Sequence, residues 1–406
     1  KTAYEITYGD WSSDVCSSDL LRDLYGSSLI LSYLTASLLE QIKQASNLGV
    51  DSIISPGLLY PNESNPAQEQ DNLSNRIQEQ EGLTNRIIIR GHLARTQAAK
   101  WLTDAWGHLL EGCRTWIETE AIPPQNLTGE HHYYWQHHWE RWKYNAWEVF
   151  WGQGNTIPTA DTDLQKRKLR RDWMGLNWMG ESSSLTGTDA VAWPQLGRSF
   201  SEQLEPKAPG IAPHTIRSWG TLDPQNLDHF YIHLSWILDQ SEQRKRHPYP
   251  TEEQLEQTPE DDRGKFISHR ERLSIPELVK RLVTLPELAK NLGILQLEDG
   301  FRDIYREPGY WTGWFMGDGD RVGAMLQHLT TDLPPNQVDE SLIHFTRAVR
   351  QAGLDFKQNQ DLFASCPGRV IYSGGMTFLG FYMLPNLDAA QIPLLLSFPG
   401  RYTNGS

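Results

Sequence analysis

One stretch near the C-terminal end of the chain, residues 313–323, constrains the fold more than any other. It reads Gly-Trp-Phe-Met-Gly-Asp-Gly-Asp-Arg-Val-Gly, which predicts a short apolar strand that ends in an acidic turn containing glycine. A helix is expected after the turn, because apolar residues recur there at helical spacing. They are Val322, Met325, Leu326 and Leu329.

A second stretch, residues 369–384, is apolar on both sides of Gly374-Gly375. Glycine accepts positive φ, so this dipeptide favours a tight hairpin. If the hairpin pairs beside the first strand, the two turns meet at one end of a sheet. A helix over residues 338–352 then supplies the crossover.

These residues resemble a known family. Asp-Gly-Asp-Arg-Val-Gly at residues 318–323, followed by Tyr-Ser-Gly-Gly at 372–375, is similar to the palm domain of the large subunit of type III-B (Cmr-type) CRISPR effector complexes. Such palms are related to polymerase palms and nucleotide cyclases. The resemblance implies an α/β (α+β) chain with two palm or ferredoxin-like, nucleotide-cyclase-related domains and a helical insert between them.

The family condenses ATP into cyclic oligoadenylate, with carboxylates from both turns holding two divalent cations. Its hairpin reads Gly-Gly-Asp-Asp, whereas this chain has Gly-Gly-Met-Thr at residues 374–377. Methionine offers Mg²⁺ no ligand, and a neutral threonine hydroxyl is a poor substitute for an anionic oxygen. The resemblance therefore predicts the fold but a weak or lost synthesis of cyclic oligoadenylate.

The site that the resemblance implies has residual catalytic carboxylates at Asp318 and Asp320. Asp318 is the remaining ligand for Mg²⁺ or Mn²⁺ with ATP, and Asp320 lies near the triphosphate, where the helix N-terminus helps to hold phosphate. The nucleotide-binding residues are expected to be Gly319, Gly323, Ser373, Gly374, Gly375, Met376 and Thr377.

Three functions stay open at this point. The first is a scaffold in an antiviral, RNA-guided interference complex, with other Cmr-type subunits and ATP as partners, and with guide and target RNA reached through the complex. The second is an active nucleotidyl cyclase that uses Asp318 and Asp320 alone. The third is a nucleotide sensor without catalysis.

Composition narrows the classes of partner. A net charge of −14 argues against a protein that coats nucleic acid, whose surface would be basic, so RNA binding is expected to be local or through partners. No apolar run is long enough to span a bilayer and no secretory leader opens the chain, which favours a cytoplasmic protein with no membrane contact. Most of the sixteen tryptophans are expected to pack in cores.

The cysteine and histidine patterns argue against two metal chemistries. Three scattered cysteines do not form a disulfide framework, and residues 181–187, where the family often has a zinc ribbon, contain no thiol, so no zinc is predicted. Residues 130–151 contain four histidines, but their spacing favours an aromatic packing helix over a metal site. The chain also lacks the His-Asp dipeptide of the family's nuclease, which predicts no DNA cleavage.

The domain boundaries are expected as follows. Residues 1–20 are taken as an artefact, because residues 10–20 look like a sequencing adapter read in frame. The first strand of the first palm is then missing. Residues 21–151 form the first palm-like domain, 152–298 a helical and linker insert, and 299–406 a second palm that is incomplete at its C-terminal end.

Within the first domain, residues 22–27 (Arg-Asp-Leu-Tyr-Gly-Ser) resemble the start of the family's first palm helix, where packing roles are expected for Arg22 and Ser27. A strand is predicted at residues 52–54, a second in 82–90, and a long helix at 94–118 with Cys113 buried.

In the middle of the chain, residues 152–163 resemble a linker, and residues 165–171 form the one concentrated basic run. This run is either a phosphate-contacting face or, as the safer interpretation, the solvated start of a helix. Ser274 and Glu277 form a capping box, which predicts a helix that starts at Ile275. On that helix, Lys280 and Arg281 either reach a nucleotide or a neighbouring subunit, or lie on a solvated surface.

Overall fold

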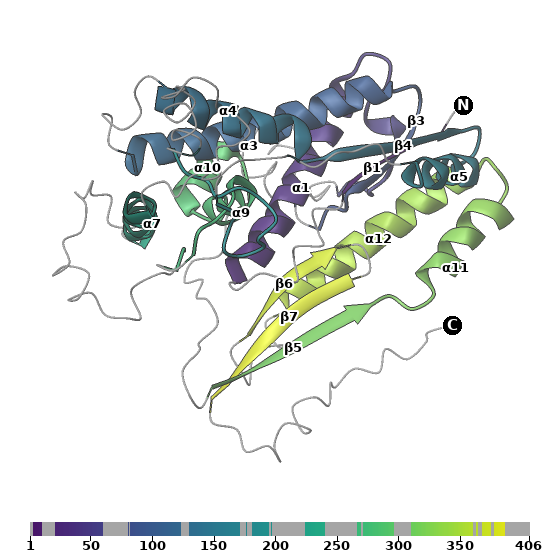
Figure 1. Cartoon of the computed structure of the whole chain (residues 1–406). Helices are drawn as coiled ribbons and strands as arrows, with labels where there is room; N and C mark the ends of the chain where they lie inside the picture. The colour runs from purple at the N-terminus through teal and green to yellow at the C-terminus, as the bar shows by residue number, and fades with distance from the viewer. Residues whose placement is uncertain are drawn as a thin grey trace, which may run out of the picture.

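The computed structural model describes residues 3–9, 21–59, 80, 82–122, 130–170, 176, 181–194, 196, 224–239, 266–268, 271–295, 310–359, 363, 368–374 and 377–385. It is an α+β structure with two antiparallel sheets, as expected, and helices pack around and between the sheets (Figure 1). None of the described helices is long and apolar enough to cross a membrane.

The N-terminal sheet has four strands in the order β2-β3-β1-β4, all antiparallel. Its elements follow in the chain as β1 (Ala3–Gly9), α1 (Leu21–Gln44), η2 (Val50–Ser52), β2 (Ile53–Ser55), β3 (Arg86–Arg90), α3 (Arg95–Glu120), α4 (Glu130–Asn145) and β4 (Glu148–Gly154). This is the split βαβ arrangement of ferredoxin-like domains, in which each helix carries the chain across to a strand two places away.

Strand β1 corrects the expectation that the first strand is missing. Its seven residues pair with β3 on one side and β4 on the other, so they occupy the inside of the sheet. The alternation of Tyr4, Ile6 and Tyr8 with polar residues is the period of two that a strand requires. Residues 10–20, which carry the adapter-like text, lie outside the described residues, and their interpretation as an artefact stays a prediction.

The C-terminal sheet has three strands in the order β5-β7-β6. Its elements are β5 (Tyr310–Asp318), α11 (Val322–Gln327), the π-helix η8 (His328–Asp332), α12 (Val338–Gln358), β6 (Gly368–Gly374) and β7 (Thr377–Pro385). The expected strand, hairpin and pairing are confirmed, and the expected crossover helix extends beyond residue 352.

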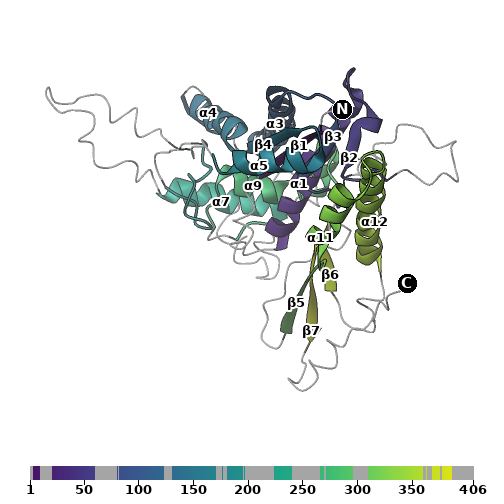
Figure 2. The ribbon, with the colours of Figure 1, turned by 90° about the vertical axis from the view of Figure 1, so that its right-hand side faces the viewer.

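The two sheets repeat one topology. In both, a strand leads through helix to two consecutive antiparallel strands, the second of which lies beside the first strand, as β1-α1-β2-β3 and as β5-α11-α12-β6-β7. The strand β5 therefore corresponds to β1, and β7 corresponds to β3. In Figure 2 the C-terminal sheet projects from the larger N-terminal part, with α11 and α12 at the junction.

A large core holds the helices to the N-terminal sheet. It joins α1, α3 and α4 to α7 (Pro224–Asp239), α9 (Ile275–Leu282) and α10 (Pro286–Leu292). Trp106, Trp135 and Trp139 are buried in it, as expected for tryptophans that pack rather than bind, and Cys113 is fully buried. The apolar residues along α1 differ in burial: Leu29, Leu39 and Ile42 are buried in this core, while Tyr33 and Ala36 are partly buried and pack against it.

A second apolar cluster joins the two sheets through α12. Ile54 and Ile88 from the N-terminal sheet pack against Leu329, Val338 and Leu342. The backbone of α12 comes so close to the segment after β2 that a Cβ on Gly57 would lie 2.4 Å from the backbone nitrogen of Arg347. Arg347 Nε also donates to the Leu58 carbonyl at 2.9 Å, which fixes the helix to this segment.

The expected linker at residues 152–163 is wrong, because α5 (Ile157–Lys168) covers most of it and β4 covers its start. Thr156 caps this helix: its hydroxyl accepts from the Thr159 N–H, and Thr159 returns a bond to the cap. The basic run therefore ends a helix rather than starting one.

The capping box predicted at α9 is confirmed, with Ser274 accepting from the Glu277 N–H. The two cationic side chains of α9, however, are buried, which corrects the expectation that they reach a ligand or solvent. Arg281 is bound by Asp23 of α1 and by Glu271, with contacts of 2.5–2.9 Å. Arg22 stacks on the Phe266 ring at 3.8 Å and Ser27 bonds to the Asp23 carbonyl, so both have the packing roles expected of them.

Candidate functional site: a cleft between the two sheets

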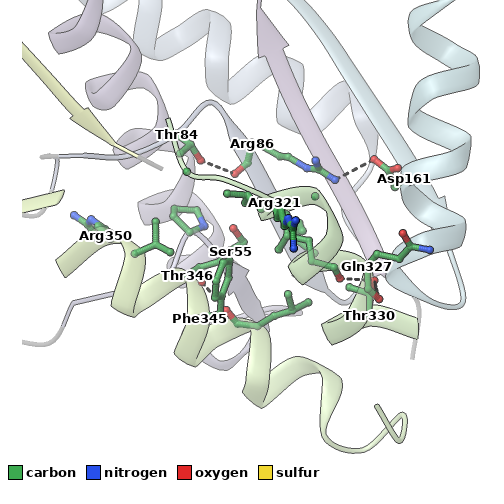
Figure 3. Close-up of a pocket in the computed structure, with 18 of the residues that line it drawn as sticks. Ser55, Thr84, Arg86, Asp161, Arg321, Gln327, Thr330, Phe345, Thr346 and Arg350 are labelled. Atoms are coloured by element: carbon green, nitrogen blue, oxygen red, sulfur yellow. Dashed lines mark hydrogen bonds and ion pairs between the residues drawn. The ribbon is translucent and has the colours of Figure 1, made fainter. Parts of the chain in front are cut away.

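A cleft of about 930 Å³ lies where β2, β3 and α5 of the N-terminal part face α11, α12 and the ends of β5 and β7. We call it the central cleft (Figure 3). Its volume is within the range of small-molecule sites in proteins. Its lining residues are Ser55, Pro56, Gly82, Thr84, Arg86, Ile88, Pro158, Asp161, Thr162, Asp318, Gly319, Arg321, Val322, Gly323, Leu326, Gln327, Thr330, Thr331, Leu342, Phe345, Thr346, Val349, Arg350 and Thr377.

The two turns predicted to meet do meet in this cleft. Asp318, the last residue of β5, is directly opposite Thr377, the first residue of β7. The Thr377 hydroxyl donates a hydrogen bond of 2.8 Å to Asp318 Oδ1. The only acidic side chain at this corner that lines the cleft among the described residues is therefore held by a neutral alcohol.

Only some of the other expected site residues line the central cleft. Gly319 and Gly323 line the cleft, whereas Asp320 is exposed in the turn and is not among the described lining residues. Ser373 and Gly374 are buried and also do not line it. A Cβ on Gly353 of α12 would lie 3.0 Å from Ser373 Oγ, so Ser373 faces that helix. The remaining two expected residues, Gly375 and Met376, lie outside the described residues.

Arg321 brings a cation to the same turn. It has φ 57° and ψ 23°, which makes it the one non-glycine residue with positive φ in the described part of the chain. This left-handed conformation costs roughly 1–2 kcal/mol for a residue with a Cβ, and such residues cluster at functional sites. Its guanidinium has no hydrogen-bond or ion-pair partner among the described residues, and Figure 3 places it in the middle of the cleft.

Two further arginines line the opposite walls. Arg86 of β3 forms an ion pair of 3.0 Å with Asp161 of α5, and both side chains are partly exposed to the cleft. Arg350 of α12 is buried and donates to the Gly57 carbonyl at 3.3 Å. Three guanidinium groups thus face two carboxylates, which gives the described lining a net positive charge that suits an anionic ligand.

Sequence reasoning did not assign the arginines to the site. Arg86 lies inside residues 82–90, where a strand was predicted, and Arg321 lies inside residues 313–323, so both were visible as cations. The missing information was that β3 and α5 form the second wall, which depends on contacts between residues far apart in the chain. Among the described residues, no group of three or more His, Cys, Asp or Glu side chains is arranged to hold a metal ion.

Comparisons with known proteins do not identify a family for this chain. No family model matches the chain, and no curated protein matches it. One solved chain, from the "Type III-B Cmr-beta Cryo-EM structure of the Apo state", aligns with 95% of this chain and 60% of its own length, at 12% identity and a TM-score of 0.40. At these values the likeness establishes neither a family nor a function for this chain, which spans 60% of the length of that solved chain.

Proposed function

We propose that this chain is a large-subunit-like component of a type III-B CRISPR (Cmr-type) interference complex. In this proposal the central cleft binds a nucleotide such as ATP, and synthesis of cyclic oligoadenylate is weak or lost. The chain acts mainly as an interaction scaffold, with other Cmr-type subunits as partners and with RNA brought by the assembly.

The observation that carries the proposal is the meeting of Asp318 and Thr377 at the end of a split βαβ sheet. A palm-type site needs a carboxylate after the first strand and a second acidic pair at the hairpin turn. The topology supplies both positions, since β5 and the β6–β7 hairpin are neighbours. The sequence supplies acidic residues at the first position only.

The donor set does not fit a pair of divalent cations. Two metals bridged by carboxylates need anionic oxygens from both turns, and here the partner of Asp318 is a hydroxyl that donates its proton to it. Asp161, the other described carboxylate in the cleft, is paired with Arg86. We therefore assign no reaction step to bound metal. What the residues themselves offer is charge for a phosphate chain, mainly from Arg321, because Arg86 is already paired with Asp161.

Restoring the acidic hairpin tests the catalytic half of the proposal. The double variant Met376→Asp/Thr377→Asp, assembled with its complex and target RNA, is incubated with radiolabelled ATP and Mg²⁺ or Mn²⁺. We expect a gain in labelled oligoadenylate of at least about tenfold over the natural chain, which corresponds to about 1.4 kcal/mol of transition-state stabilisation. The matched control is Met376→Asn/Thr377→Asn, which changes shape similarly without adding charge.

Robust oligoadenylate from the natural chain contradicts the proposed loss and supports the alternative of an active cyclase that uses Asp318 and Asp320. That alternative also predicts a loss of product in both Asp318→Asn and Asp320→Asn. Asp320 is not among the described residues that line the cleft, which disfavours this alternative.

Binding without turnover is a separate test, because a nucleotide sensor needs the cleft but not the chemistry. Calorimetric titration of the purified protein with ATP is expected to show that Arg321→Ala weakens binding about tenfold, the loss of one charge-assisted hydrogen bond. Lys290→Ala removes an exposed cation from α10, outside the cleft, and is expected to change nothing. No ATP binding by the natural protein, or equal binding by the two variants, would remove the nucleotide from the proposal.

A further inference from the structure

We propose that a second site, on the far side of α5 from the central cleft, binds single-stranded nucleic acid directly. This basic groove has a volume of about 340 Å³ and is formed by the end of α5, strand β4 and the start of α3. Its lining consists of four cationic residues, Arg95, Lys166, Arg167 and Arg170, two acidic residues, Asp163 and Glu148, and Val149, Phe150 and Trp151 of β4. It goes beyond the proposed function, in which RNA is reached only through partners.

The fold brings the cations together from separate parts of the chain. Lys166, Arg167 and Arg170 come from the last turn of α5 and the residues just after it, and Arg95 begins α3. The long helices and β4 put these termini at one place, where all four side chains line the same groove. A run that looked like a solvated helix face in the sequence is therefore one wall of a concave surface.

The cations differ in what they already bind. Arg167 pairs with Asp163 at 3.0 Å. Burial raises the pKa of Asp163, but the Gln153 N–H and Arg167 outweigh it and hold that pKa below its usual range, so Asp163 stays ionised and neutralises Arg167. Arg95, Lys166 and Arg170 are exposed and form no ion pair among the described residues, although the charge of Lys166 also helps to lower the pKa of Asp163. Four cations thus face two carboxylates, Asp163 and Glu148, in the groove, and three of these cations are outside an ion pair and accessible to phosphates.

An aromatic surface lies beside these charges. The Arg167 guanidinium lies over the Trp151 ring, 4.4 Å from its centre, so the groove presents a cation and an aromatic ring in contact. Guanidinium planes and aromatic rings are the surfaces on which unpaired bases stack. Leu169, next to these residues in the chain, is 87% exposed and adds apolar surface at this end of α5.

These features favour single-stranded nucleic acid over the other anions. An acidic peptide would bind the cations but would not need the Trp151 ring with Arg167 over it. A lone phosphate would need one cation rather than three in one groove. A duplex is also disfavoured, because its bases are stacked on one another and cannot reach Trp151. The overall charge of −14 limits such binding to this local patch.

The test uses the full-length protein and a fluorescein-labelled, unstructured 12-nucleotide RNA, followed by anisotropy at several salt concentrations. With three phosphates neutralised, the slope of log affinity against log salt is expected to be about −2. The variant Arg95→Ala/Lys166→Ala/Arg170→Ala is expected to lose at least tenfold in affinity and most of the slope. The variant Trp151→Phe is expected to weaken binding by a smaller factor with the slope unchanged.

The matched control, Lys43→Ala/Lys100→Ala/Lys290→Ala, removes the same charge from surfaces outside the groove and is expected to bind like the natural protein. Thermal unfolding of all variants shows whether each remains folded, which is expected because the three substituted groove cations, Arg95, Lys166 and Arg170, are exposed. Three outcomes overturn the proposal: no RNA binding, equal loss in the control, or displacement of the RNA by ATP or poly-glutamate as effectively as by unlabelled RNA. Loss of ATP binding in Arg321→Ala with the RNA affinity unchanged separates this site from the central cleft.

Discussion

At the scale of single residues, His138 of α4 shows how an enclosed ring departs from its ordinary chemistry. The residue is half-buried, but its Nδ1 atom is enclosed and has no hydrogen-bond partner among the described residues. Burial lowers the pKa of His138 to about 3, with smaller contributions from the charges of Arg141 and His137. The ring is therefore neutral in the folded protein at any pH near neutrality.

This lowered pKa predicts a loss of stability in mild acid. Below about pH 6.5 the unfolded chain takes up a proton at His138 that the folded protein refuses until about pH 3. Over that window the free energy of unfolding falls by up to about 1.4 kcal/mol per pH unit, and above it His138 contributes no pH dependence.

Urea unfolding at pH 7 and pH 5 measures the effect. His138→Gln, which does not titrate, is expected to reduce the difference in unfolding free energy between the two pH values by up to about 2 kcal/mol. His92→Gln serves as the control, because that side chain is exposed. An unchanged difference in His138→Gln would show that the ring is protonated in the folded state.

At the scale of elements, α1 and α9 are held together by a buried group of charges rather than by apolar contacts alone. Arg281 of α9 is completely buried and makes paired contacts with Asp23 of α1 and with Glu271. Burial opposes its charge, but Asp23 and Glu271 outweigh burial and raise the pKa of Arg281 above its usual range. A single guanidinium therefore compensates two carboxylates of low exposure, and the group depends on it.

Removal of the arginine is expected to be costly. Arg281→Met leaves Asp23 and Glu271 unpaired at low exposure, and breaking such a buried group costs about 3–5 kcal/mol. Arg272→Met removes a neighbouring arginine whose partner Asp228 is 51% exposed, so a loss below about 1 kcal/mol is expected. Chemical denaturation compares the two, and equal losses would contradict the role given to burial.

Several elements could be predicted from the sequence because their signals are local. The β6–β7 hairpin follows from Gly374-Gly375, and the start of α9 follows from Ser274 and Glu277. The start of α5 was missed because its capping box has threonine at both the N-cap and the N3 position, whereas glutamate or glutamine is usual at N3. The burial of Arg281 was also missed, since a cation on a helix looks the same in sequence whether it meets water or two carboxylates.

At the scale of the whole molecule, the candidate site depends on how α12 joins the two sheets. The pairing of Asp318 with the hairpin was predictable from two glycine-rich turns, because both belong to one sheet. The wall made by Arg86 and Asp161 was not predictable, because it requires the N-terminal sheet to pack against α11 and α12 through residues that are far away in the chain.

The apolar cluster under α12 predicts where the molecule opens when it is weakened. Leu342 is 2% exposed and lies in this cluster, so Leu342→Ala is expected to cost about 2–5 kcal/mol. Hydrogen exchange is expected to increase in α12 and β2 more than in α3, because α12 and β2 lose the contact that joins them. ATP binding in the central cleft is expected to weaken in the same variant.

Leu110→Ala, a truncation at 3% exposure in the large core, provides the comparison. Its exchange is expected to increase in α3 and the helices packed around it. If both variants raise exchange uniformly along the described chain, the two sheets unfold as one cooperative unit and the local account of α12 fails.

Helix α5 lies between the central cleft and the basic groove. Asp161 and Thr162 line the central cleft, and Lys166 and, just after the helix, Arg170 line the basic groove. A rigid helix of twelve residues cannot shift at one end of this wall without moving the other. If a ligand in the central cleft changes the affinity of the basic groove for its own ligand by some factor, the ligand in the basic groove must change the affinity of the central cleft by the same factor. This follows from thermodynamic reciprocity. The helix that separates the two sites is thus also the element through which any such coupling would pass.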